Sequence, residues 1–260
     1  IEKGLALGAL DVILKPYSPL FLAKRIETHF LSVRQREEIQ RYKDTADSLA
    51  MQRQASILRL QDSLLDTLVS LSEGGQGSTA FRSTGELRGY LSAMTMEMRR
   101  KGIYSKELSI WSDEIFVASA QLHDIGKIIV RDGILQKPGR LTTEEVEAVK
   151  SHTILGVTVI ETIEKRGSDT NFFNNAKLFA AAHHERWDGS GYPLGLKGRT
   201  IPLQGRMMAI VDVYDALVSE RPYKRPLAHD AAREIILNSR GSLFDPLLTD
   251  VFLSVSDVFD

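Results

Sequence analysis

Apolar residues recur at helical spacing along most of this 260-residue chain. From Leu87 onward they return every three or four positions, a period that places them on one face of successive helices. No alternating run typical of a strand interrupts this pattern. We therefore expect an all-α domain over residues 73–260. Its helices are expected to include Leu87–Met98, Ile110–Leu122, Thr142–His152, Ala176–His184 and Gly205–Val218.

Residues 31–72 form a second kind of pattern. They contain neither Gly nor Pro, are rich in charge and Gln, and carry two narrow apolar series, Ile39–Leu49 and Ile57–Leu71, that change register near Arg53. A seam this narrow on a long helix is typical of a coiled coil that joins two protomers. The sequence leaves open the alternative that the helix packs against its own domain.

The first 30 residues read as a strand followed by a helix. A short buried strand is expected within Gly8–Pro16, ending at a Lys-Pro turn, and a helix is expected from Ser18 with Pro19 in its first position. This unit resembles the last strand and helix of a bacterial response-regulator receiver domain, where a Lys stands just before a Pro, as Lys15 does here. The resemblance implies an α/β receiver remnant over residues 1–30 and a cognate histidine kinase as partner. Any other strand-helix unit would give the same pattern.

Composition narrows the possible partners and chemistry. The net charge of −1 gives no global electrostatic case for binding DNA. Cysteine is absent, so thiolate metal ligands and disulfides are excluded. The chain shows no 18-residue apolar run and no signal peptide, so we expect a cytoplasmic protein without a membrane partner.

Histidines gather in one part of the chain. Five of the six lie between positions 123 and 229, including the pairs His123-Asp124 and His183-His184. The second pair runs into a loop in which Gly191 and Pro193 favour a tight turn. Imidazole and carboxylate are good ligands for transition metals, so metal-dependent chemistry is the leading expectation.

Two further side chains are candidate ligands. His152 follows a capped helix start and can project into the same cavity. Asp212 stands in an otherwise apolar helical segment, and a buried carboxylate without a partner is costly, so we expect it to meet a cation. Asp124 has two oxygens and can bridge two divalent ions.

These motifs together resemble the HD-GYP phosphodiesterases, a branch of the HD-domain metal phosphohydrolases. The resemblance runs from about residue 86 to the end of the chain and is carried by His123–Lys127, His152, His183-His184, Gly191–Pro193, Asp212–Leu217 and Arg221–Lys224. It implies an HD-domain helical bundle. It also implies a response-regulator output enzyme that hydrolyses cyclic di-GMP to the linear dinucleotide pGpG, to GMP, or to both.

The resemblance assigns a role to each motif residue. Metal ligands for two divalent ions are implied at His123, Asp124, His152, His183, His184 and Asp212, with Asp124 as the bridge. Iron or manganese is the first expectation, and nickel or zinc is also compatible with such ligands. Asp124 is thereby also a catalytic residue.

Five other residues are implied to act on the substrate. Lys127 would neutralise the scissile phosphate, although a Lys can also simply cap a helix C-terminus. Tyr192 would contact the ligand, on a backbone shaped by Gly191 and Pro193. Arg221 and Lys224 would hold the guanine and phosphate portions; the alternative is that they belong to a solvated loop.

One feature departs from the family pattern. Family members usually carry a Glu and a His on the helix before the His-Asp pair, but this chain has no histidine between His29 and His123. Glu86, or else Glu73, could supply an oxygen instead. The departure keeps open a degenerate domain that binds cyclic di-GMP or a protein partner without turnover. Another cyclic dinucleotide, such as cyclic GMP-AMP, is a third possibility.

Overall fold

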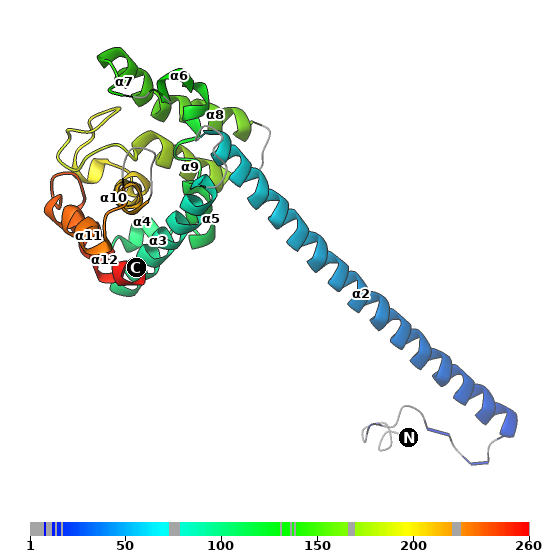
Figure 1. Ribbon diagram of the computed structural model, residues 1–260. Coiled ribbons are helices and arrows are strands. Elements are labelled where there is room, and N and C mark those ends of the chain that lie inside the picture. The colour runs from blue at the N-terminus through cyan, green and yellow to red at the C-terminus, as the bar shows by residue number, and fades with distance from the viewer. Residues whose placement is uncertain are drawn as a thin grey trace. The chain divides into compact units, whose positions relative to one another are not determined.

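The computed structural model describes residues 8, 12–13, 15–16, 18–72, 79–130, 132–135, 137, 139–165, 170–219 and 225–259. Within these residues the regular structure is helical and no strand occurs (Figure 1). The expected all-α fold is therefore confirmed at this level. The strand expected within Gly8–Pro16 is not seen at Val12 and Ile13, and much of that segment lies outside the described residues. No described helix is long and apolar enough to cross a bilayer.

The chain divides into two compact units, Ile1–Gln61 and Asp62–Asp260. Helix α2 (Pro19–Ser72) begins where the sequence predicts, and its first turn is closed by the Leu22 amide donating to the Ser18 carbonyl. It continues without interruption through position 30, where the expected domain boundary lies, because nothing between Pro19 and Ser72 breaks a helix. The expected division between residues 30 and 31 stays a prediction.

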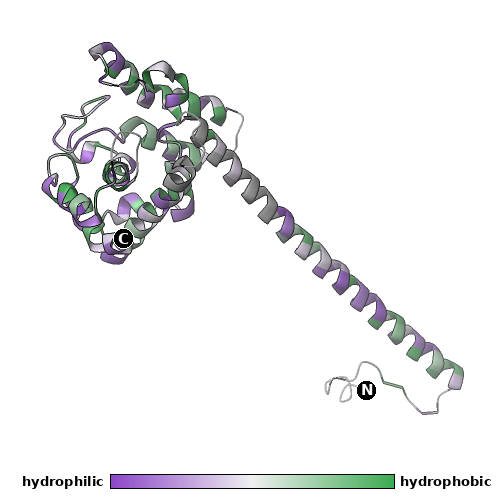
Figure 2. Cartoon of the chain, viewed as in Figure 1, coloured by the Kyte–Doolittle hydropathy of each residue, from purple (hydrophilic) through white to green (hydrophobic). Residues whose placement is uncertain are grey.

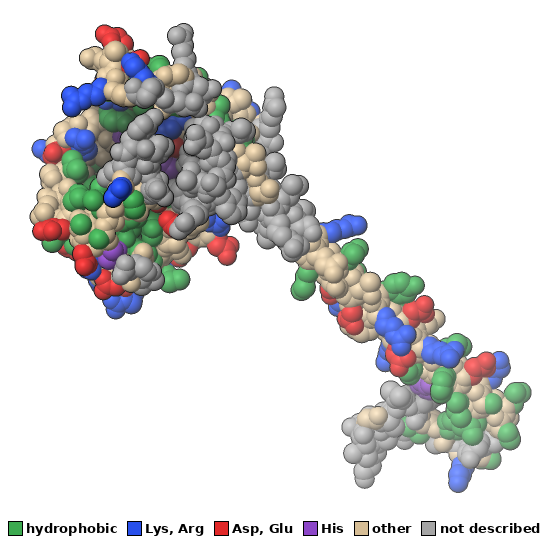
Figure 3. Space-filling view, viewed as in Figure 1, with side chains coloured by type: hydrophobic (Ala, Val, Ile, Leu, Met, Phe, Trp, Pro, Cys, Tyr) green, Lys and Arg blue, Asp and Glu red, His purple; other side chains and the backbone are tan. Residues whose placement is uncertain are grey.

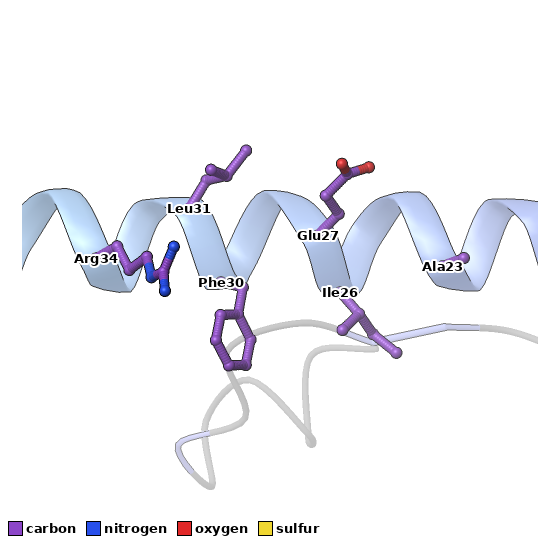
Figure 4. A pocket seen from close by; sticks show the side chains of 6 residues that line it. All are labelled: Ala23, Ile26, Glu27, Phe30, Leu31 and Arg34. Atoms are coloured by element: carbon purple, nitrogen blue, oxygen red, sulfur yellow. The ribbon is translucent and has the colours of Figure 1, made fainter.

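The first unit exposes many apolar side chains. Figure 2 shows hydrophobic and hydrophilic residues interspersed along this part of α2, and Figure 3 shows apolar side chains standing among charged ones on its surface. Ile26 and Phe30 project from the same side of the helix and help to line a shallow hollow of about 540 Å³ (Figure 4). Such exposure on a lone helix is compatible with a partner surface.

The core of the second unit is built around α10 (Leu203–Val218). This helix is buried along most of its length and packs against α3 (Thr79–Lys101), α9 (Thr170–Ala182), α11 (His229–Asn238) and α12 (Pro246–Val255). Apolar side chains from these helices form one continuous cluster. The remaining short elements are α4 (Ser105–Leu108), α5 (Asp113–Ala120), α6 (Asp132–Leu135), η2 (Gly198–Thr200) and η3 (Ser256–Val258).

A second, smaller apolar cluster joins η1 (Ile125–Ile129) and α8 (His152–Glu164) to α9. Leu68, near the end of α2, is half-buried and packs against this cluster. At this position the apolar seam therefore contacts its own domain, as in the alternative to a coiled coil. The coiled-coil prediction for the earlier part of α2 stays untested.

Two glycines allow the close helix contacts that position the histidines. A Cβ on Gly126 would lie 2.0 Å from the His152 carbonyl oxygen and 2.5 Å from the Gly156 nitrogen, so η1 can press onto α8 only without a side chain there. A Cβ on Gly205 would lie 2.5 Å from the Ala182 carbonyl oxygen. The first contact brings the start of η1 onto the start of α8, and the second brings α10 onto the end of α9.

The helix boundaries near the histidines differ from the expected ones. Helix α7 (Thr143–Lys150) begins with the expected cap, a reciprocal pair of hydrogen bonds between Thr142 and Glu145. It ends at Lys150, and α8 starts at His152, so the single helix expected through His152 is two helices. Helix α9 begins earlier than expected, at Thr170, and ends at Ala182. His183 and His184 consequently lie in the turn that follows it.

Candidate metal centre

Four side chains converge between η1, α8 and the turn after α9. The side chains are Asp124, His152, His183 and His184, and each offers one ligand atom within 4.8 Å of the others. Both His152 and His183 are buried, at 1% and 2% exposed. Residues almost 60 positions apart thus form one group of nitrogen and oxygen ligands.

Hydrogen bonds to the backbone fix the histidine rings. The Nδ1 atom of His123 lies 2.9 Å from the Ala120 carbonyl oxygen, and that of His183 lies 3.0 Å from the Phe179 carbonyl oxygen. His152 makes the same kind of bond within its own turn. Because a carbonyl oxygen can only accept, each Nδ1 carries the hydrogen, and each neutral ring presents the lone pair of Nε2. In metal-binding histidines, a hydrogen bond from the other ring nitrogen orients the ring in this way.

The Nε2 lone pairs of the buried rings face one another. The Nε2 atoms of His152 and His183 are 3.2 Å apart. Asp124 Oδ1 lies 3.2 Å from the first and 3.6 Å from the second, and this buried oxygen accepts no hydrogen bond from any described residue. Lone pairs and a carboxylate oxygen at such distances repel one another unless a cation lies among them. The donor set therefore fits a divalent metal ion.

Electrostatics favour the protonation states that metal ligands need. Burial, reinforced by the neighbouring His183, lowers the pKa of His184 to about 2. Burial also lowers the pKa of His123. Burial alone would raise the pKa of Asp124, but the Lys127 ammonium and the neighbouring histidines together outweigh it and hold that pKa well below the usual value. Neutral imidazoles beside an ionised carboxylate are ready to bind a metal without losing protons.

His123 lies beside the group of four, and Asp212 is near enough for its charge to act on His123. His123 Nε2 is 3.5 Å from Asp124 Oδ2, and its ring meets that of His183 edge to face at 5.1 Å. Asp212 is half-buried on α10, and its negative charge acts on the pKa of His123. Both side chains could thus serve a second ion next to the first, although neither belongs to the group of four.

Lys127 donates from its ammonium to Asp124 Oδ2, one turn along η1. Its side chain remains 28% exposed, so the ammonium lies at the edge of the cluster rather than beneath it. Lys127 therefore places a positive charge next to the group of four ligands.

Tyr192 covers one side of the cluster. Its ring stacks on that of His184, with centroids 4.7 Å apart and planes at 28°. Burial raises the pKa of Tyr192, and the charges of Asp124 and Asp212 add to the rise, so the phenol stays neutral. Its backbone follows Gly191, where a Cβ would lie 2.3 Å from the Arg186 nitrogen. The Gly-Tyr-Pro segment thus lies directly against the histidine pair.

Comparison with known proteins places this arrangement in a family. A model of the HD domain matches residues 85–248, which is more than half of the chain. The chain belongs to the HD domain family. All four converging ligands fall within the matched residues.

This HD domain has relatives among cyclic dinucleotide phosphodiesterases. The chain is 40% identical over 253 residues to a probable cyclic di-GMP phosphodiesterase of Vibrio cholerae. This alignment covers 97% of the chain and 57% of the relative. The chain is 36% identical over 255 residues to the cyclic di-GMP phosphodiesterase response regulator RpfG of Xanthomonas campestris, over 97% of this chain and 63% of the relative. A third relative, the 3'3'-cGAMP-specific phosphodiesterase 2 of Vibrio cholerae, is 40% identical over 141 residues, 54% of this chain and 26% of its own length. The chain thus spans roughly three fifths or less of these relatives.

Four further candidate residues were expected to serve the site. Arg221 and Lys224 lie outside the described residues, as does Glu73. The fourth, Glu86, lies on α3, where its charge adds to the burial that raises the pKa of Tyr90, and it is not part of the group of four.

Two residues of the HD domain contribute to the site without having been predicted. Lys150 Nζ lies 5.5 Å from the centre of the Tyr192 ring, a cation–π contact at the end of α7. Glu185 is buried and binds the loop that carries Tyr192. Lys150 gave no sequence signal apart from its closeness to His152. Glu185 stood inside the histidine motif as an acidic residue, but only the folded loop shows which atoms it contacts.

Proposed function

We propose that this protein is an HD-GYP phosphodiesterase that hydrolyses cyclic di-GMP to pGpG, to GMP, or to both. The observation that carries the proposal is the buried Asp124 oxygen, which faces the lone pairs of His152 and His183 and accepts no hydrogen bond from the described residues. The names of the relatives in Vibrio cholerae and Xanthomonas campestris support the same substrate.

The proposed centre holds two divalent transition-metal ions, with iron or manganese first and nickel or zinc as alternatives. Its proposed ligands are His123, Asp124, His152, His183, His184 and Asp212, with Asp124 as the bridge. Bound metals would supply a water activated at neutral pH and a charge that polarises the phosphodiester. The side chains keep their lone pairs available because backbone carbonyls hold the Nδ1 hydrogens.

The remaining proposed residues bind and orient the substrate. Lys127 holds a positive charge beside Asp124, where it can neutralise the scissile phosphate. Tyr192 offers its ring as a wall of the site, on a backbone shaped by Gly191 and Pro193. Arg221 and Lys224 are proposed to hold the guanine and phosphate portions of the dinucleotide.

We also propose the wider setting of the domain. Residues 1–30 would be the end of a receiver domain addressed by a cognate histidine kinase, residues 31–72 a helical linker that joins two protomers, and residues 73–260 the HD-GYP domain. The protein would act in the cytoplasm. Likeness to a response regulator over 97% of this chain supports this setting.

Incubation of the purified, manganese-loaded or iron-loaded protein with cyclic di-GMP tests the proposed reaction. Chromatography should show pGpG or GMP, and chelation by EDTA should abolish the product. Binding of cyclic di-GMP without product by protein that holds none or one ion per chain would instead support a degenerate domain, which the lack of a histidine between His29 and His123 favours. Faster cleavage of 3'3'-cGAMP in a parallel assay would instead indicate 3'3'-cGAMP as the substrate, the dinucleotide named for the third relative.

A further inference from the structure

The loop that carries Tyr192 is tied to one buried carboxylate. Glu185 is only 2% exposed and directly follows His184. Its Oε1 accepts the backbone N–H of Leu194 at 2.8 Å, and its Oε2 accepts that of Leu196 at 2.8 Å. One side chain thus holds two amides nine and eleven positions further along the chain.

These two bonds account for both carboxylate oxygens. No basic side chain of the described part of the chain forms an ion pair with Glu185, so the backbone amides are what stabilise the buried group there. Hydrogen bonds to an ionised acceptor are stronger than neutral ones. Glu185 directly follows a candidate metal ligand but is not part of the group of four.

The start of the same loop is fixed independently. The Tyr192 amide donates to the His184 carbonyl at 3.2 Å, and a Cβ on Gly191 would lie 2.6 Å from the Glu185 Cα. The loop therefore closes on residues 184–186 at its start and on the Glu185 side chain at its end. Tyr192 lies between the two attachments, with its ring on His184.

We propose that Glu185 is a positioning residue that clamps the loop and so holds Tyr192 over the metal-binding histidines, ready for a ligand that spans both. This rests on the proposed function, because the ligand meant is a cyclic dinucleotide. Releasing the loop weakens binding of that large ligand, since the Tyr192 ring must then be ordered on binding. It leaves His123, His152 and His183 in place, because backbone carbonyl oxygens fix their rings.

The test compares Glu185→Gln with Tyr192→Ala and with the exposed control Glu161→Gln on α8. An amide in place of the carboxylate turns an NH₂ group toward one backbone N–H, so one loop bond is lost without a change of volume. We expect KM for cyclic di-GMP to rise about tenfold in Glu185→Gln. We expect kcat/KM for bis(4-nitrophenyl) phosphate, which is too small to need the loop, and the metal content to stay at the wild-type level. The double variant with Tyr192→Ala should be no worse than Tyr192→Ala alone.

A second readout does not depend on activity. Hydrogen–deuterium exchange of residues 190–197 should be faster in Glu185→Gln and unchanged in Glu161→Gln. If Glu185→Gln does not fold, Glu185→Asp, which keeps the charge but shortens its reach, is measured in the same way. Unchanged exchange together with unchanged KM would overturn the proposal, and so would a loss of metal that explains the whole defect.

The two proposals fail in different ways. Wild-type protein that cleaves bis(4-nitrophenyl) phosphate but neither binds nor cleaves cyclic di-GMP would refute the proposed substrate. Hydrogen exchange of the loop would then still show whether Glu185 holds the loop in place. Normal turnover of cyclic di-GMP by a variant whose loop exchanges fast would refute the positioning role alone.

Discussion

At the residue scale, the two carboxylate oxygens of Asp124 lie in different surroundings. Oδ2 accepts from the Lys127 ammonium, whereas Oδ1 lies among histidine lone pairs with no hydrogen bond from the described residues. An anion in this position repels the lone pairs around it unless a cation is bound. The Asp124 charge is therefore expected to matter for metal binding more than for the folded state itself.

Replacing Asp124 by Asn tests this expectation. We expect the metal content to fall by at least about tenfold, with loss of phosphodiesterase activity, because the amide removes the negative charge that binds the cation. Plasma emission spectrometry on dialysed protein measures the metal. The exposed Asp230→Asn on α11 is the matched control and should keep both metal and activity. Wild-type metal content in Asp124→Asn would contradict the ligand role.

At the scale of elements, the site depends on how closely η1, α8 and α9 approach. Gly126 permits the contact of η1 with α8, and Gly205 permits that of α10 with the end of α9. Packed interiors do not absorb an added methyl group without displacing neighbours. Both glycines should therefore tolerate no side chain.

Gly126→Ala should displace η1 from α8 and move Asp124 away from His152. We expect a loss of stability of about 1–3 kcal/mol together with weakened metal binding, since the added Cβ would meet backbone atoms rather than a flexible side chain. Urea denaturation with metal titration measures both. Gly89→Ala on α3 is the control, because nothing lies within 4 Å of its added Cβ; it should be neutral or slightly stabilising. Equal behaviour of the two variants would contradict the close approach.

Thr142→Ala acts at the opposite end of α7 from Lys150, the residue that contacts Tyr192. Thr142 caps α7 through the Glu145 amide, so its loss should cost about 1 kcal/mol in the free energy of unfolding. Metal content should not change. A large loss of metal in this variant would show that α7 and the centre are more tightly coupled than the fold suggests.

Local signals explain what the sequence could predict at these two scales. The Thr142–Glu145 cap, the start of α2 at Pro19 and the histidine pair at 183 are all written in neighbouring residues. The break at Ser151 was not predictable, because the apolar pattern continues across it. The contact of Gly126 with Gly156 and the bonds from Glu185 to Leu194 join positions whose spacing carries no periodic signal. Such contacts appear only once tertiary packing is known.

At the scale of the whole molecule, α2 belongs to both compact units. Its earlier seam residues are exposed within a single chain, with Ile39 at 66% and Leu49 at 49%. Leu68 instead packs on its own domain. The coiled coil therefore stays a prediction for the earlier part of the helix, whereas Leu68 packs as in the alternative.

Charged substitutions should separate these parts. Ile39→Glu combined with Leu49→Glu should convert a dimer to monomer while leaving the melting of the second unit unchanged. Leu68→Glu should instead lower the stability of the second unit, because it places a charge against an apolar cluster. Sedimentation velocity and thermal unfolding measure the two effects. Met51→Glu, exposed and outside the seam, is the control; an unchanged dimer in the Ile39/Leu49 variant would count against the coiled coil.

The most direct test of the central claim is a crystal of the whole chain grown with Mn²⁺ and measured at a wavelength where manganese scatters anomalously. The account predicts strong anomalous density bounded by Asp124 and by the Nε2 atoms of His152 and His183. Density at that place that is no stronger than the background, with the four side chains well ordered, would contradict the metal centre and the function proposed from it.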